Sequence, residues 1–256
     1  MRVVGIAVLG LFSLVAVAVA VTAACDSKPA PNPFEEKKDT VEPPALSAPP
    51  KPTGPPEFSV AAEGPKVGWT YIMLDKPDGK QKLAEQIGDN KEYVSGKDVK
   101  VTADRQAKLA YVAAMLDALD AGGATSITVA TDTRPEFAKT VKFTPRSAGK
   151  SAPSCSVVAK VLTERRNAVW SLAGGTAVRS PKGLAGPDMA MTEMDLTNAA
   201  HRCKDSDFVF VSADDDVEWG LAYDLAASTQ TLEKAKLERV ILLEPAPVAG
   251  RPVKLE

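Results

Sequence analysis

Residues 101–132 read VTADRQAKLAYVAAMLDALDAGGATSITVATD, and their pattern decides the fold. Apolar and polar residues alternate from Val99 to Ala103, which is typical of a half-buried strand. Over residues 107–119 the apolar side chains recur at helical spacing, and Gly122-Gly123 then stops the pattern. Residues 127–130, ITVA, read as a further short strand. The order predicts a β-α-β unit.

A similar pattern returns about 110 residues later, where residues 208–245 read FVFVSADDDVEWGLAYDLAASTQTLEKAKLERVILLEP. Without a gap, residues 101–104 align with residues 211–214. Each strand therefore ends in an alanine-aspartate pair, Ala103-Asp104 in the first segment and Ala213-Asp214 in the second, and a helical pattern follows. A repeat at this spacing predicts two similar domains.

The residues before each β-α-β unit predict matching elements. Strands are expected at residues 58–62 and 67–74 with a helix at 79–87, and again at 155–162 and 168–172 with a helix at 192–203. The expected fold class is α/β, an α+β two-layer arrangement of two tandem β-β-α-β-α-β units at residues 58–145 and 154–247. Residues 133–153 form the junction, in which Phe137, Val141 and Phe143 can make an edge strand.

Acidic and hydroxyl residues predict where the helices begin. Asp104 can cap the helix at 107–119, and Asp215, with Glu218 folding back, can cap the helix that starts near Trp219. Thr192 and Asp195 resemble a capping box for the helix at 192–203.

The N-terminus has the order of an export signal. Met1 and Arg2 precede an apolar run at residues 3–21, and Thr22-Ala23-Ala24-Cys25 resembles a lipobox, although that motif usually has an aliphatic residue where Thr22 stands. We expect residues 1–24 to be a lipoprotein signal peptide and Cys25 to carry the lipid. The alternative is a retained transmembrane helix, because about 20 apolar residues span a bilayer.

The segment that follows is rich in proline. Residues 25–57 contain half of the chain's 20 prolines and show no apolar periodicity, so they predict an extended linker between the lipid anchor and the folded part. An unstructured pro-segment is the alternative. Asp26, directly after Cys25, resembles an inner-membrane retention signal of enteric bacteria, and the choice between inner and outer membrane stays open.

Charge and cysteine content narrow the class of protein. The formal net charge of −2 provides no basic surface for nucleic acid. With Cys25 assigned to the anchor, Cys155 and Cys203 remain as a pair in an oxidising compartment, which predicts a disulfide between them. The alternative is two separate buried thiols.

The two quoted segments resemble the periplasmic domain of ExbD/TolR proteins, in which a strand ending in alanine-aspartate precedes an amphipathic helix, a glycine turn and a short strand. Members of that family couple proton flow to envelope work through a transmembrane aspartate. Residues 3–21 contain no ionisable residue, so this resemblance does not imply proton coupling here. It implies a periplasmic domain that dimerises and contacts envelope motor or transport proteins or peptidoglycan. Two copies in one chain can pack as an internal version of that dimer.

No set of residues predicts catalysis, a cofactor or a metal site. We expect structural roles for the lone histidine, for the acidic cluster, for the glycine pairs and for the serines beside Cys155: His201; Asp214, Asp215, Asp216 and Glu218; Gly122-Gly123 and Gly174-Gly175; Ser154 and Ser156. The aromatic residues best suited to a sugar or protein contact are mostly expected in the core: Trp69, Tyr71, Tyr111, Trp170 and Trp219.

The expected function is that of a non-catalytic, lipid-anchored envelope protein facing the periplasm, an interaction or scaffolding component similar to the periplasmic part of biopolymer-transport proteins. The alternative is a small-molecule or metal-binding lipoprotein. Its site would lie between the two copies, lined by the strand ends at Asp104 and Asp214.

Overall fold

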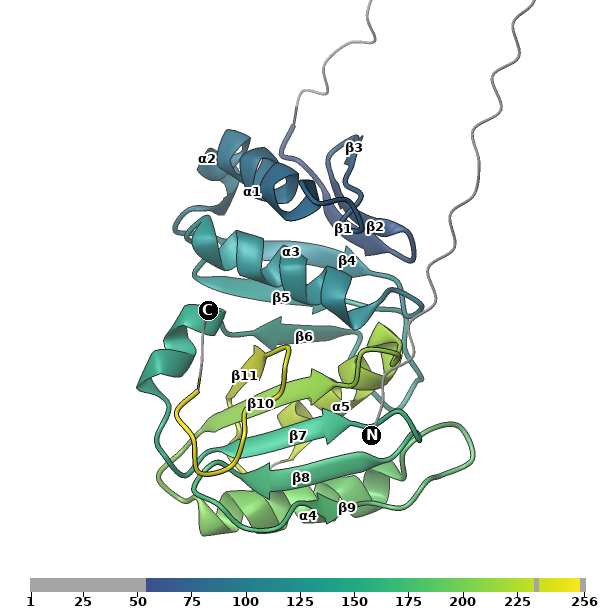
Figure 1. Ribbon diagram of the computed structural model, residues 1–256, viewed down its shortest axis with the longest axis vertical. Helices are drawn as coiled ribbons and strands as arrows, with labels where there is room; N and C mark the ends of the chain where they lie inside the picture. The colour runs from purple at the N-terminus through teal and green to yellow at the C-terminus, as the bar shows by residue number, and fades with distance from the viewer. Residues whose placement is uncertain (1–53, 233–234, 254–256) are drawn as a thin grey trace, which may run out of the picture. The chain divides into compact units, whose positions relative to one another are not determined.

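The computed structural model describes residues 54–232 and 235–253 (Figure 1). The predicted signal peptide, Cys25 and nearly all of the proline-rich linker lie outside this range. The N-terminal half contains β1 (Phe58–Ala61), β2 (Gly64–Val67), β3 (Thr70–Tyr71), α1 (Gly79–Asp89), α2 (Lys91–Val94), β4 (Asp98–Ala103), α3 (Leu109–Ala121) and β5 (Ser126–Ala130). β6 (Thr140–Phe143) and a 3-10 turn, η1 (Arg146–Ser151), follow.

The C-terminal half repeats the order of elements. It contains β7 (Val157–Val161), β8 (Asn167–Ser171), β9 (Val178–Arg179), α4 (Met189–Arg202), β10 (Phe208–Ala213), α5 (Trp219–Thr231) and β11 (Arg239–Leu242). Among the described residues, none of the helices has the length and apolar character needed to cross a bilayer.

The strands of the described residues join one mixed sheet of 11 strands in the order β3-β2-β1-β4-β5-β6-β11-β10-β7-β8-β9. β1, β4 and β5 are parallel in the N-terminal half, as are β7, β10 and β11 in the C-terminal half. In each half an antiparallel hairpin continues outward, through β2 and β3 or through β8 and β9. The fold is therefore mixed α/β, as the sequence predicts at this coarse level.

β6 joins the two halves, so the expectation of an edge strand in the junction was wrong. β6 lies antiparallel beside β5 and meets β11 through a single residue pair, Phe143 with Val240. The Thr144 N–H also donates to the Val240 carbonyl at 2.8 Å. Figure 1 shows α3 in front of β4 and β5 but α5 behind β10 and β7. Buried residues of α3 and α5 belong to one hydrophobic core, so both helices cover the same face of the sheet, and the sheet twists strongly at this narrow junction.

The two halves differ in how many sheet faces are covered. β4 alternates between exposed and buried residues, as its sequence predicts, whereas every residue of β10 is buried. A second apolar cluster covers the outer face of the C-terminal half; it consists of Val158, Leu172, Phe208, Phe210, Ile241 and Leu243, packed against Ala152, Trp170 and Val253. The equivalent face of the N-terminal half stays open and polar.

The predicted caps of α3 and α5 were wrong. α3 begins only at Leu109, and the Asp104 carboxylate instead accepts the N–H of Gln106 at 2.8 Å, which closes a turn before the helix. α5 begins at Trp219, and the residue before it, Glu218, makes no side-chain cap. Asp104 and Asp215 stand too far before Leu109 and Trp219 for their side chains to cap the helix starts.

The start of α4 also differs from expectation. The helix begins at Met189, where Asp188 caps it by accepting the N–H of Met191 at 3.1 Å. Thr192 and Asp195 therefore form no capping box: the Thr192 hydroxyl donates to the Asp188 carbonyl, and Asp195 accepts a hydrogen bond from Ser180.

The strand expected at residues 67–74 is interrupted. Val67 ends β2, and Gly68 with a φ of 57° lets the chain turn with Trp69 before β3 pairs back on β2. The alternation of apolar and polar residues continues across the two-residue turn at Gly68 and Trp69, so a period-two pattern does not reveal that the strand is interrupted there.

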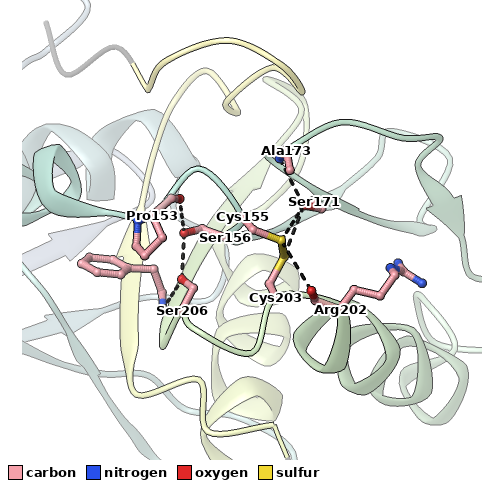
Figure 2. The surroundings of a disulfide bond; sticks show 9 residues. Pro153, Cys155, Ser156, Ser171, Ala173, Arg202, Cys203 and Ser206 are labelled. Carbon is pink, nitrogen blue, oxygen red and sulfur yellow. Dashed lines mark hydrogen bonds between the residues drawn. A yellow bond between two sulfur atoms is a disulfide. The ribbon is translucent and has the colours of Figure 1, made fainter.

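The predicted disulfide between Cys155 and Cys203 is present. It ties the residues before β7 to the end of α4, and its surroundings are polar (Figure 2). The Ser171 hydroxyl lies 3.5 Å from Cys155 Sγ and 3.3 Å from Cys203 Sγ, and its oxygen accepts the Ala173 N–H. Ser156, the neighbour of Cys155 in the sequence, donates a hydrogen bond to the Pro153 carbonyl at 2.8 Å and therefore has a structural role.

Replacing both cysteines, Cys155→Ser with Cys203→Ser, is expected to lower the free energy of unfolding by about 4 kcal/mol. The reason is that the bond closes a loop of 48 residues and so reduces the entropy of the unfolded chain. Urea denaturation followed by circular dichroism measures the change. The unchanged chain reduced with dithiothreitol is the matched control and should unfold at the same midpoint as the double variant. Equal midpoints in the double variant and the oxidised unchanged chain would contradict the expectation.

Candidate functional site

The two halves meet where the loops after β4 and β10 touch. Lys108 and Glu218 form an isolated antiparallel bridge, and these two residues occupy the same position in the gap-free alignment of the two segments. Beside the bridge, the Gly220 N–H donates to the Arg105 carbonyl and the Trp219 N–H to the Ala107 carbonyl, both at 2.8 Å. The start of α5 is therefore bound to the loop that precedes α3.

An ion pair between Arg105 and Asp224 crosses this contact. The two guanidinium nitrogens of Arg105 lie 2.9 Å from the two carboxylate oxygens of Asp224, a bidentate arrangement. The Thr133 hydroxyl donates to the same carboxylate at 2.6 Å, and Arg134 approaches it at 3.5 Å. The Asp224 side chain is 2% exposed and that of Arg105 31% exposed. The hydrogen bond to Asp224 raises the pKa of Arg105.

Aromatic residues of α5 complete the contact. Trp219 and Tyr223 are fully buried and stack edge to face at 5.8 Å. The Trp219 indole N–H donates to the Thr131 hydroxyl at 2.9 Å, and the Tyr223 hydroxyl donates to the Ala138 carbonyl at 2.9 Å. Burial, together with the charge of Asp224, raises the pKa of Tyr223 to about 12.

A hollow of about 670 Å³ lies at the carboxyl ends of β1 and β4, next to Arg105. Its lining consists of Ser59, Val60, Ala61, Thr102, Ala103, Asp104, Arg105, Gln106 and Asp132. Ligands often bind at the carboxyl ends of parallel strands, because chain crossovers leave space there. Asp104, from the predicted strand-end pair, lines this hollow, whereas Asp214 does not.

The hollow opens onto the uncovered face of the N-terminal half. Strand register places one row of side chains across this face from β3 to β6: Tyr71, Lys66, Ser59, Thr102, Ala130 and Thr140. A second row contains Lys100, Thr128 and Lys142. Hydroxyl and ammonium groups therefore dominate a surface that the C-terminal half covers with apolar residues.

The other residues considered from the sequence lie in helix ends and turns. His201 is exposed in the last turn of α4. Asp214, Asp215 and Asp216 lie in the turn before α5, and the described residues contain no group of three or more metal-ligating side chains. The Gly122-Gly123 pair ends α3 as expected, with Gly123 at a φ of 89°.

The aromatic residues divide between core and surface. Trp219 and Tyr111 are buried, as expected, whereas Trp69 and Tyr71 are 79% and 45% exposed. Trp69 follows β2 at the outer end of the sheet, where the Lys66 ammonium lies 5.5 Å above its ring. A core location for these two residues was therefore wrong, because they lie in the turn after β2 and in β3, at the outer end of the sheet.

Sequence reasoning missed Arg105, Thr133 and Asp224. One signal was present: Asp224 stands inside the apolar helix segment GLAYDLAA, where a charge requires a partner. Its partner comes from 119 residues earlier in the chain, and no local pattern identifies it.

Arg105→Ala is expected to lower the free energy of unfolding by about 3 kcal/mol, because it leaves the Asp224 carboxylate buried without its bidentate partner. Asp224→Asn costs less, since Arg105 can turn toward water. Urea denaturation gives both values. Arg239→Ala, which breaks the exposed pair with Asp207, is the matched control with an expected cost below about 1 kcal/mol. Equal losses in Arg105→Ala and the control would contradict a role for burial.

Stability is expected to fall as pH rises from about 10 to about 12. Tyr223 has a pKa of about 12 in the folded state against 10.0 for an ordinary tyrosine, so the unfolded chain loses its proton first and is favoured by rising pH. Tyr223→Phe should flatten this part of the pH profile, whereas the exposed Tyr93→Phe should not. Denaturation midpoints measured across this pH range test the difference.

In comparisons with known proteins, no family model, no curated protein and no solved structure matches this chain.

Proposed function

We propose that this chain is a non-catalytic, lipid-anchored interaction component of the bacterial cell envelope, built from two copies of an ExbD/TolR-like unit that pack as an internal dimer. The copies are residues 58–145 and 154–247. Matching hydrogen bonds support the equivalence. The Asp104 N–H donates to Val60 at 2.8 Å, and the Asp214 N–H donates to Val161 at 2.9 Å. The strand order is likewise symmetric about β6.

The observation that carries the proposal is the bridge between Lys108 and Glu218. These residues are equivalent in the two copies, so each copy contacts the other through the same position. Contact through one self-complementary patch is the arrangement of a two-fold dimer. A chain that holds both copies needs no second molecule to form it.

A fixed pair of copies presents two separate contact surfaces. Apart from Tyr93 and Val248, the exposed large apolar side chains of the described residues lie toward the two outer ends of the sheet: Trp69, Tyr71 and Met73 at the β3 end, and Val178, Leu184, Met191 and Met194 at the β9 end. Such residues favour protein contacts. The absence of an acidic residue from residues 3–21 supports an accessory role in an envelope complex rather than proton coupling.

Lipid attachment is tested by growing cells with labelled palmitate. The full-length chain is expected to incorporate the label, and Cys25→Ser is expected to abolish it. Thr22→Leu, which brings the motif to its usual form, should keep or increase the labelling. Labelling that survives Cys25→Ser would remove the proposed anchor.

Partner contact is tested by photocrosslinking in cells from the two sheet ends. A photoreactive amino acid replaces Trp69 or Leu184 in the full-length chain, and Glu238, exposed before β11, is the control position. Motor or transport membrane proteins, or peptidoglycan fragments, are expected in the covalent products from Trp69 and Leu184 but not from Glu238. Products that contain neither, at both ends, would overturn the scaffold proposal.

A further inference from the structure

The two strand-end aspartates have different surroundings. Asp214 is half-buried; its Oδ1 lies 2.5 Å from the Lys160 ammonium, and its Oδ2 accepts the N–H and the hydroxyl of Thr163 at 2.8 and 3.1 Å. Asp104 is exposed, and within the described part of the chain its carboxylate has one recorded contact, the hydrogen bond from Gln106. One aspartate is paired with a cation of its own copy, and the other is not.

Strand register identifies what Asp104 lacks. Lys160 stands opposite Ser212 on β10, and Ser59 stands opposite Thr102 on β4. Because Thr102 and Ser212 are equivalent in the gap-free alignment, Ser59 occupies the position of Lys160. Counting three residues further, Ala62 stands where the C-terminal copy has Thr163. A hydroxymethyl group and a methyl group thus replace the side chains that bind Asp214.

The space beside Ser59 belongs to the hollow already described. Ser59, Ala61 and Asp104 line it, and Asp132 adds a second carboxylate. Arg105 is the only cationic residue of this lining, and its charge is already paired with Asp224. Lys66 stands opposite Ser59 on the same face, but its ammonium lies over the Trp69 ring, so Asp104 has no cationic partner among the described residues. A bare metal ion would find no group of three ligands in this part of the chain, which leaves an organic cation as the partner of Asp104.

We infer that this hollow binds an alkylammonium group, whose nitrogen pairs with Asp104 as the Lys160 nitrogen pairs with Asp214. The aliphatic part lies over Ala61, and the hydroxyls of Ser59 and Thr102 accept the remaining ammonium hydrogens. This inference rests on the equivalence of the two copies in the proposed function. A lysine side chain of a partner protein and a free alkylamine supply the same chemistry.

The binding test uses the full-length, isotope-labelled chain in detergent micelles and follows the backbone amide signals of Ala61 and Gln106 by NMR. Nα-acetyl-lysine methylamide is expected to shift these signals with a dissociation constant on the order of millimolar, as one charge-assisted contact in an open site allows. Nα-acetyl-norleucine methylamide, which lacks the charge, should not. Equal shifts by the two probes, or none with the lysine probe, would overturn the inference.

Asp104→Asn is expected to weaken binding of the lysine probe at least about tenfold. Asp89→Asn, which removes an exposed carboxylate at the end of α1, is the matched control and should leave the affinity unchanged. A retained affinity in Asp104→Asn would place the ammonium elsewhere. Crosslinking from Trp69 and Leu184 does not involve Asp104, so loss of amine binding and loss of partner contact are separable.

Two reciprocal variants test the equivalence itself. Ser59→Lys should fill the hollow with an internal ammonium, raise the melting temperature and abolish binding of the lysine probe. Lys160→Ala should lower the melting temperature, and butylammonium chloride should restore it better than sodium chloride at equal ionic strength, because screening alone is the same for both salts. Equal effects of the two salts, or unchanged probe binding in Ser59→Lys, would contradict the inference.

The two sources of the ammonium group are then compared. Butylammonium represents a free amine, and a lysine-containing peptide represents a partner protein. A peptide that binds Asp104 more tightly than butylammonium assigns the hollow to a protein contact, and equal affinities assign it to a small amine.

Discussion

The buried pair of Arg105 and Asp224 is the interaction on which the arrangement of the two halves depends. Asp224 is almost fully inaccessible in α5, and a carboxylate in that position requires a cation. The loop after β4 provides it, and the same loop gives its backbone carbonyls to the start of α5. Gly220 permits this approach, because a β-carbon there would lie 2.9 Å from the Arg105 side chain. The sheet junction alone, with one residue pair between β6 and β11, would hold the halves far less firmly.

The same pair positions the candidate site. Arg105 follows Asp104 directly, so holding the guanidinium against α5 also holds the turn in which Asp104 stands. One side of the hollow is thereby supported from the other half of the chain, although every residue that lines it belongs to the N-terminal half. This links the proposed scaffold to the proposed ammonium site, because the contact between the two halves of the chain holds the turn at which a ligand or partner would bind.

The two halves of the chain differ in which residues lie on the outer face of the sheet. Phe208 and Phe210 on β10 correspond to Asp98 and Lys100 on β4, so one outer sheet face is apolar and covered while the other is polar and open. The covered half also carries the disulfide. Its strand-end aspartate is satisfied internally by Lys160. The open half keeps small and polar residues at the matching positions, which leaves surface and space available to another molecule.

Local pattern was sufficient to predict the repeated strand-loop-helix segments and the half-buried character of β4, because periodicity reflects which side of each element is covered. It did not separate β2 from β3 or predict α2 and β9. The disulfide was predicted because Cys155 and Cys203 are the two cysteines that remain once Cys25 is assigned to the expected anchor. Helix starts were predicted poorly, since Asp104 has a closer donor in Gln106 than in α3. The position of β6, the pairing of Arg105 with Asp224 and the hollow beside Asp104 were decided only by the tertiary structure. Each depends on residues brought together from distant parts of the chain. The equivalence of Ser59 and Lys160 is recognised only from strand register, which places Ser59 opposite Thr102 and Lys160 opposite Ser212.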